Sequence, residues 1–494
     1  MKNKKSPRAA LDMDANEFRE VGHHLVDKIA DFLGNVSERN VHKPGAAKIA
    51  HEILGVTPLP NTGSSNENVV EDISDLLLEQ SLFNGHPRFW GYVNGSPSPL
   101  GALADLLASS INANVCTWTV APVASEIERQ AVGWIGDLLN FPNDPECNSG
   151  GLLVSGGTMA NITGLLAAKR ARFGAKIREQ GNNYEGAENS KFYATTETHA
   201  WLEKALDIMG FGESAINRIS TDKNLRMDVN ALQEAINNDL KKGFIPLAVI
   251  ASAGTVSTGA IDPLEQISEI CAQHKIWFHI DGAYGAVSAC VPSVSKQFFG
   301  IGLADSVAMD AHKWLYVPFE AGCILLRDRQ HLVDSFSHET TYYPTTKSGE
   351  TLPIAYRDQG IQTSRGFRAL KVWMCLKRAG RDGYAEMIGN NIRQAERLYK
   401  LVNQHPELEA VSHGLSITTF RYHPAEVQDE EILNQLNQKI LSSLQEEAWA
   451  YPSHTWVNGK YLIRVCITNF RTCLLYTSDA ADDLLCVDLG GRRI

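Results

Sequence analysis

Two residues of this chain together suggest how it could bind an aldehyde cofactor. Lys313 lies between the apolar stretches 305–309 and 321–326, which both have the character of buried strands. Asp281 directly follows another such stretch, 276–280. A lysine amine can form a Schiff base with an aldehyde, and an aspartate can keep a pyridine nitrogen protonated. Pyridoxal phosphate (PLP) requires these two protein groups.

Either residue alone has an ordinary explanation, as a solvated lysine or a strand-end cap. Two further features agree with the cofactor interpretation. Gly156-Gly157-Thr158 follows the apolar stretch 151–155 and opens a helix, which is the geometry of a phosphate cradle, although a Gly-Gly turn is as often only a tight turn. His199 is a second candidate, although a lone histidine is more often structural. Because independent signals agree, PLP is the predicted cofactor.

Two segments resemble the core motifs of the group II PLP-dependent amino-acid decarboxylases: His279-Ile280-Asp281-Gly282-Ala283-Tyr284-Gly285 and Asp310-Ala311-His312-Lys313-Trp314-Leu315. That family includes the aromatic-amino-acid, histidine and glutamate decarboxylases, and the similarity runs from about Phe18 to Thr472. The resemblance implies PLP fold type I, which is aspartate-aminotransferase-like. It is an α/β fold with a mainly parallel sheet in the large domain and a smaller C-terminal α+β domain.

The resemblance also implies roles for individual residues. Lys313 would bind PLP covalently, Asp281 would pair with the ring nitrogen, and His199 would stack on the ring and help to manage a proton. Tyr342, in a polar loop between Phe336 and Phe367, would deliver a proton; the alternative is a surface-loop tyrosine. The cofactor-binding residues implied by the family are Gly157, Thr158, His199, Thr255, Asp281, Ala283, His312 and Lys313.

Two positions depart from the family pattern. Asp310 stands where some members have an asparagine near the phosphate, and a carboxylate there would repel phosphate unless it points away or accepts hydrogen bonds. Its role stays open. Ala200 stands where a serine is common, and it cannot supply a hydroxyl.

The substrate pocket is expected to draw on the segments 86–92 and 114–118, with Tyr92, Asn114, Cys116 and Trp118 as its residues. In aromatic decarboxylases the second segment supplies bulky apolar side chains, whereas this chain has an asparagine and a cysteine there. The pocket is therefore predicted to be smaller or more polar. An indole or phenol side chain is possible but is not strongly favoured.

Composition limits the class of protein. The chain has 494 residues, a hydrophobic fraction of 44% and a net charge of −11, which argues against nucleic-acid binding. Nine scattered cysteines without a CxxC pair suggest reduced thiols in a cytoplasmic protein and no metal site. The basic segment 1–8 lacks a following apolar core, so it does not read as a secretory signal, and no apolar run is long enough for a membrane span.

The pattern along the chain predicts an N-terminal arm and helical segment (1–98), a large PLP-binding α/β domain (99–382) and a small α+β domain (383–472). An amphipathic helix at 12–34 could be a core helix or, as the family implies, an arm that packs on a partner subunit. Alternating strands and helices predict an open, mainly parallel sheet, which binds ligands beyond the carboxyl ends of its strands. The tail 473–494 leaves the family pattern and is predicted to be non-native.

These observations predict the decarboxylation of an L-amino acid to an amine and CO₂, through an external aldimine and a quinonoid intermediate. Retention of His199 and Tyr342 favours this reaction over oxidative deamination to an aldehyde. The alternatives are an aminotransferase or carbon–carbon lyase, for which Arg464 is the one arginine to test as a carboxylate ligand, and a non-catalytic PLP-binding dimer. The family implies a homodimer in which the segment Thr363–Arg365 meets the partner's phosphate.

Overall fold

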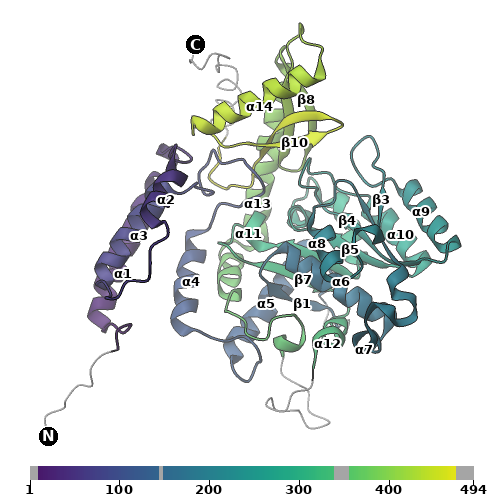
Figure 1. The fold of residues 1–494 in the computed structure, drawn as a ribbon, viewed down its shortest axis with the longest axis horizontal. Coiled ribbons are helices and arrows are strands. Elements are labelled where there is room, and N and C mark those ends of the chain that lie inside the picture. The colour runs from purple at the N-terminus through teal and green to yellow at the C-terminus, as the bar shows by residue number, and fades with distance from the viewer. Residues whose placement is uncertain (1–8, 144–147, 339–354, 474–494) are drawn as a thin grey trace.

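The computed structural model describes residues 9–143, 148–338 and 355–473. Two sheets organise the chain, a large one in its central part and a small one near its C-terminus (Figure 1). This arrangement confirms the predicted fold type I architecture.

The large sheet has seven strands in the order β1-β7-β6-β5-β4-β2-β3. Neighbours from β6 through β3 are parallel, while β7 is antiparallel to both β6 and β1. The strands are β1 (Gly150–Val154), β2 (Ser190–Thr195), β3 (Ile216–Ile219), β4 (Ile245–Ser252), β5 (Trp277–Asp281), β6 (Ser306–Asp310) and β7 (Gly322–Leu326). The bounds of β1, β5, β6 and β7 lie within one residue of the apolar stretches 151–155, 276–280, 305–309 and 321–326, while β3 was not predicted.

Helices cover both faces of this sheet, and the strands are accordingly apolar on both faces. Along β2, Phe192 and Ala194 pack with α6 (Gly157–Phe173) and α8 (Trp201–Ile208), whereas Tyr193 faces the opposite core. That second core is shared with α5 (Pro122–Leu139), α9 (Val229–Lys241) and α10 (Leu264–His274).

The parallel strands β2, β4, β5 and β6 all end at one edge of the sheet. Short segments after them bear polar side chains, and α11 (Ala311–Trp314) follows β6 directly. The fold therefore collects residues that are far apart in the sequence at one edge, where open α/β sheets bind their ligands.

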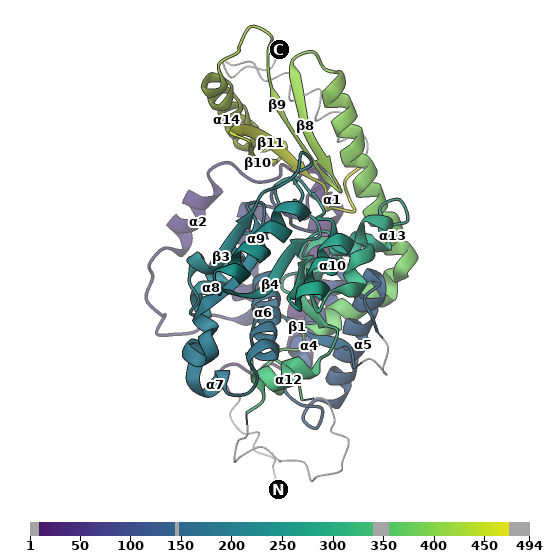
Figure 2. The same ribbon diagram turned by 90° about the vertical axis from the view of Figure 1, so that its right-hand side faces the viewer.

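The small sheet has the order β10-β11-β9-β8 and is antiparallel throughout. Its strands are β8 (Leu408–Gly414), β9 (Ile417–Tyr422), β10 (Ser453–Val457) and β11 (Lys460–Cys466), and α14 (Glu430–Glu446) packs on it. Figure 2 shows this sheet above the large one, with α13 (Ala369–Gln404) running between them. The sequence-based boundary at 382–383 falls inside α13, next to a kink at Gly380, which has φ +63°.

The N-terminal helices α1 (Ala15–Asn35), α2 (Ala46–Leu54) and α3 (Asn66–Gln80) form a layer beside α4 (Pro99–Ile111) (Figure 1). No residue of α1 or α2 is buried within the described part of the chain. The alternative that α1 is a core helix is therefore wrong, and its amphipathic face has no core of its own to fill.

None of the helices in the described ranges combines the length and the hydrophobicity that crossing a lipid bilayer requires.

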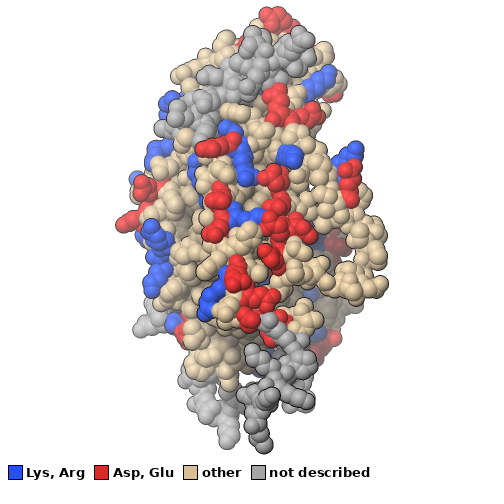
Figure 3. Space-filling view, turned by 90° about the vertical axis from the view of Figure 1, so that its left-hand side faces the viewer, with Lys and Arg blue, Asp and Glu red and all other residues tan. Residues whose placement is uncertain are grey.

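On the face that presents α1–α3, acidic and basic side chains lie interspersed (Figure 3).

Candidate active site

A cavity of about 710 Å³ lies at the carboxyl edge of the large sheet, below the small sheet. Segments that follow β1, β2, β4, β5 and β6 line it on one side, and β10 with the end of α14 lines it on the other. The sheet topology thus places several short polar segments around a volume large enough for a cofactor and a small substrate.

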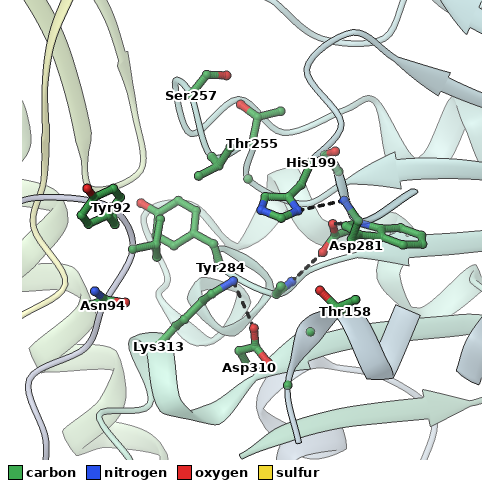
Figure 4. Close-up of a pocket in the computed structure, with 18 of the residues that line it drawn as sticks. Tyr92, Asn94, Thr158, His199, Thr255, Ser257, Asp281, Tyr284, Asp310 and Lys313 are labelled. Carbon is green, nitrogen blue, oxygen red and sulfur yellow. Dashed lines mark hydrogen bonds and ion pairs between the residues drawn. The ribbon is translucent and has the colours of Figure 1, made fainter. Parts of the chain in front are cut away.

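Lys313 projects into this cavity from α11 (Figure 4). Its Nζ lies 3.0 Å from Oδ2 of Asp310, the last residue of β6, and the Asp310 side chain is buried. The backbone of Lys313 packs directly on Gly95, where a Cβ would lie 1.8 Å from the Lys313 carbonyl oxygen. The lysine is therefore held at its backbone by Gly95 and at its amine by Asp310, with the amine inside the cavity.

The start of α6, called the cradle below, has the features of an anion-binding site. Gly157 is its first residue, no side chain among the described residues caps its first turn, and Thr158 lines the cavity. A Cβ on Gly157 would lie 2.7 Å from Asp310 Oδ2, so a glycine is needed here. Because the first N–H groups of a helix have no partners within the helix, they favour an anion at this point.

Asp281 ends β5, and both of its carboxylate oxygens accept hydrogen bonds. Oδ2 accepts from the indole Nε1 of Trp201 at 2.6 Å, and Oδ1 accepts from the backbone N of Ala283 at 3.1 Å. The carboxylate is buried at the cavity wall. These donors stabilise the charged carboxylate and fix its direction.

His199 lies across the cavity from Lys313 (Figure 4). Its Nδ1 accepts a hydrogen bond from the backbone N of Trp201 at 3.2 Å. In the neutral ring the proton is therefore on Nε2. Trp201 was not predicted from the sequence. The signal that could have identified it is its place two residues after the candidate histidine, because a buried indole N–H there needs an acceptor near the site.

The remaining predicted cofactor residues Thr255, Ala283 and His312 also line the cavity. Thr255 Oγ1 lies 3.1 Å from Thr258 Oγ1 and accepts from the backbone N of Ala260 at 3.1 Å. His312 is held by the backbone of Ala321 through Nδ1, and burial lowers the pKa of its imidazole.

The structure brings only one of the four predicted substrate residues into the cavity. Tyr92 lines it, with the uncommon φ of +54°, whereas Asn114, Cys116 and Trp118 do not. Asn114 Oδ1 accepts from the backbone N of Arg365, Cys116 is buried, and Trp118 Nε1 donates to Glu126. Tyr342 lies outside the described residues.

The small domain contributes a polar wall that sequence reasoning did not foresee, with Gln445, Tyr451, Ser453, His454 and Thr455. Arg464 joins it and is 3% exposed. Its Nε donates to the Val256 carbonyl at 2.7 Å and its Nη1 to the Tyr92 carbonyl at 2.9 Å. Its Nη2 is buried and has no partner among the described residues.

Arg365 belongs to the segment Thr363–Arg365, and its side chain is engaged inside its own subunit. Its guanidinium is buried and bonds to Glu128 and to the carbonyl oxygens of Val115 and Leu153. All of these partners are in its own subunit, so the guanidinium is engaged within that subunit.

The arrangement fits PLP. The site offers an amine for its aldehyde, a carboxylate for its ring nitrogen and a helix N-terminus for its phosphate. The one discordant group is Asp310, whose Oδ1 is buried without a partner in the described residues.

Comparisons with known proteins agree with this chemistry. The sequence model of the pyridoxal-dependent decarboxylase conserved domain matches residues 54–423. The aromatic-L-amino-acid decarboxylase of Bacillus atrophaeus is 33% identical over 463 residues, which cover 94% of this chain and 93% of that protein. Phenylacetaldehyde synthase of Arabidopsis thaliana is 30% identical, covering 94% of each chain. The structure of Oryza sativa TDC with PLP and tryptamine has a TM-score of 0.88 and 26% identity, covering 97% and 98% of the two chains.

Proposed function

The chain belongs to the pyridoxal-dependent decarboxylase family, and we propose that Lys313, Asp281 and His199 are the residues with which it removes CO₂ from an L-amino acid. The family makes it a PLP-dependent carboxy-lyase. One observation supports the assignment of the residues: three side chains from separate segments converge on one cavity beside the start of α6.

Each group has a distinct task in this proposal. Lys313 binds the cofactor through Nζ, the first turn of α6 binds its phosphate, and Asp281 keeps its ring nitrogen protonated. When bound, PLP supplies an electron sink for the bond that breaks. His199 presents Nε2–H to the cavity, where it can hydrogen-bond the substrate carboxylate or return a proton to Cα after CO₂ leaves.

Arg464 is proposed as a further ligand for the substrate carboxylate. The free Nη2 of a buried guanidinium is a strong donor for an anion, and Arg464 already holds the backbone of Tyr92. Replacing it with lysine should raise KM more than it lowers kcat, because the charge stays while the second donor is lost. An unchanged KM would contradict this role.

Hydroxylated aromatic amino acids are the proposed substrate class. The relatives include an aromatic-L-amino-acid decarboxylase and tyrosine decarboxylases. In the polar wall, His454 and Thr455 offer hydrogen bonds to ring hydroxyls, which phenylalanine lacks. A site built to bond a hydroxyl discriminates strongly against the analogue without it.

The reaction and the substrate can be tested together. The PLP-loaded enzyme is incubated with tyrosine, dihydroxyphenylalanine, tryptophan, phenylalanine, glutamate and diaminobutyrate, and CO₂, amine and aldehyde are measured. We expect amine and CO₂ in equal amounts, with tyrosine or dihydroxyphenylalanine as the best substrate. Aldehyde with ammonia would instead indicate oxidative chemistry, and would contradict the proton-donor role expected for Tyr342.

Lys313→Ala should lose the visible absorbance of the bound cofactor.

A homodimer is proposed as the active form. On α4, Leu103, Leu106, Leu107 and Ile111 recur at helical spacing and are each between 50% and 58% exposed. The segment Asn114–Trp118 follows this helix and lies outside its own cavity, so we propose that it serves the partner's site. An apolar face of this kind is typical of a subunit interface.

Light scattering tests this assembly. Leu106→Glu should convert dimer to monomer, whereas Leu240→Glu, on an exposed position of α9, should not. A wild-type monomer at micromolar concentration would contradict the proposal.

A further inference from the structure

We infer that Trp201 is a positioning residue that sets the protonation of the cofactor's ring nitrogen through Asp281, and that it also fixes the tautomer of His199. This inference rests on the role proposed for Asp281 above. The indole is 3% exposed, and Trp201 is the first residue of α8.

One residue contacts both candidate catalytic groups. The side chain of Trp201 donates to Asp281 Oδ2 at 2.6 Å, and its backbone N donates to His199 Nδ1 at 3.2 Å. The segment after β2 is thereby tied to the end of β5, although β4 lies between these strands in the sheet. Trp201 is therefore an anchor that the two candidate residues share.

The indole cannot turn away from Asp281 without cost. Its ring is embedded in the core beneath α8, with Leu202 and Ala205, and lies edge-on to His279 with ring centroids 6.0 Å apart. An indole N–H is a donor only, and Asp281 is its acceptor. Packing thus directs a rigid donor at one carboxylate oxygen.

This donor influences where a proton resides. A hydrogen bond to the charged form of a carboxylate favours that form. With the bond present, a proton shared between Asp281 and a pyridine nitrogen stays on the nitrogen, and the pair is carboxylate and pyridinium. Without this bond, the buried carboxylate keeps only the hydrogen bond from the backbone N of Ala283. The neutral pair, a carboxylic acid and an unprotonated pyridine, then becomes more populated.

The experiment uses Trp201→Phe, which removes the indole N–H but keeps the backbone N–H that contacts His199. Trp373→Phe is the matched control, because its indole also donates at 2.6 Å, to Gln130 Oε1 on another part of the molecule. Both variants and the wild type are loaded with PLP labelled with ¹⁵N at the ring nitrogen, and the ¹⁵N chemical shift is measured across pH. Cofactor affinity is measured by absorbance.

We expect a protonated ring nitrogen in the wild type and in Trp373→Phe, and a shift toward the unprotonated signal in Trp201→Phe. Cofactor affinity should fall about tenfold in Trp201→Phe only, as expected for a lost hydrogen bond to a charged group. A purely packing role would lower the melting temperature and leave the ¹⁵N shift unchanged, and that result would overturn the inference.

Two further outcomes keep the test decisive. An unprotonated nitrogen in the wild type would show that the role proposed for Asp281 is wrong, and the inference would fall with it. If Trp201→Phe does not fold, Asp281→Asn replaces it, with the indole N–H resonances of the cofactor-free protein as the readout. One indole resonance should then move strongly relative to the wild type; no change in any of them would overturn the inference.

Discussion

Arg365 and Glu128 form an ion pair that is almost completely removed from solvent, with 1% and 0% of their side chains exposed. Arg365 also bonds to the carbonyl oxygen of Leu153, and Glu128 accepts from the backbone N of the same residue at 3.0 Å. The pair therefore fixes the end of β1, which leads into the cradle at the start of α6.

Breaking this pair should destabilise the protein. Glu128→Gln leaves the arginine charge buried without a counter-ion, and we expect a loss of about 3–5 kcal/mol, seen as a lower thermal unfolding midpoint. Glu126→Gln, on the same helix, removes an exposed pair with Arg129 and should cost at most ~1 kcal/mol. Equal effects of the two substitutions would contradict the structural role of the buried pair.

Asp310→Asn should bind PLP more tightly. The substitution removes a carboxylate beside the phosphate cradle and frees Lys313 from its ion pair, so we expect a gain of about tenfold, or ~1.4 kcal/mol. Absorbance titration measures the dissociation constant. For pyridoxal, which lacks the phosphate, the substitution should increase the affinity by a smaller factor. Weaker binding of PLP by the variant would show that Asp310 supports the cofactor instead.

His279 should make the protein sensitive to acid. Burial lowers the pKa of this imidazole to about 4, from about 6.5 in an unfolded chain. The unfolded state therefore binds a proton that the folded state does not, and stability falls as the pH drops from about 6.5 toward 4. The total loss is up to ~3 kcal/mol at about 1.4 kcal/mol per pH unit.

Unfolding midpoints of the wild type and His279→Asn across this pH range measure the effect. The variant loses the bonds to Ser306 and Asn161 and starts less stable, but its stability should depend less on pH. Parallel pH profiles would assign the acid sensitivity to other groups.

Gly95→Ala should impair cofactor binding far more than an ordinary loop substitution. The added Cβ would lie 1.8 Å from the Lys313 carbonyl oxygen, so one of the two backbones must move. We expect reduced PLP content and a lower melting temperature. Gly63→Ala is the control, because a Cβ there meets no atom within 4 Å. Full PLP content in Gly95→Ala would contradict the close packing.

Much of the site could be predicted from the sequence because its signals are local. Lys313, Asp281 and the Gly156-Gly157-Thr158 segment each follow an apolar stretch that had to become a buried strand, and parallel strands bring their carboxyl ends to one edge. The predicted and observed strand bounds agree closely for the same reason, because each buried strand corresponds to one continuous apolar stretch of the sequence.

The tertiary structure decided what depends on packing between distant segments. Trp201 had only a local signal, its position two residues after His199, and Arg464 was expected only as an arginine to test. The wall from β10 has no local signal. The position of the small domain brings Arg464 and this wall into the cavity. The segment Asn114–Trp118 was predicted to line the substrate pocket, but its residues do not line the cavity of their own subunit. The ion pair of Arg365 with Glu128 is also a product of the fold, because a buried guanidinium needs a counter-ion and Glu128 supplies it.

The sequence alone thus determined the chemistry: a lysine, a carboxylate and a glycine-rich helix start at strand ends, and hence the cofactor. Tertiary structure decided which groups surround that chemistry and which hydrogen bonds hold them. The physical reason is the separation along the chain over which each interaction acts. Strand and turn preferences act over a few residues, whereas hydrogen bonds such as Trp201 to Asp281 join positions that only the folded sheet brings together.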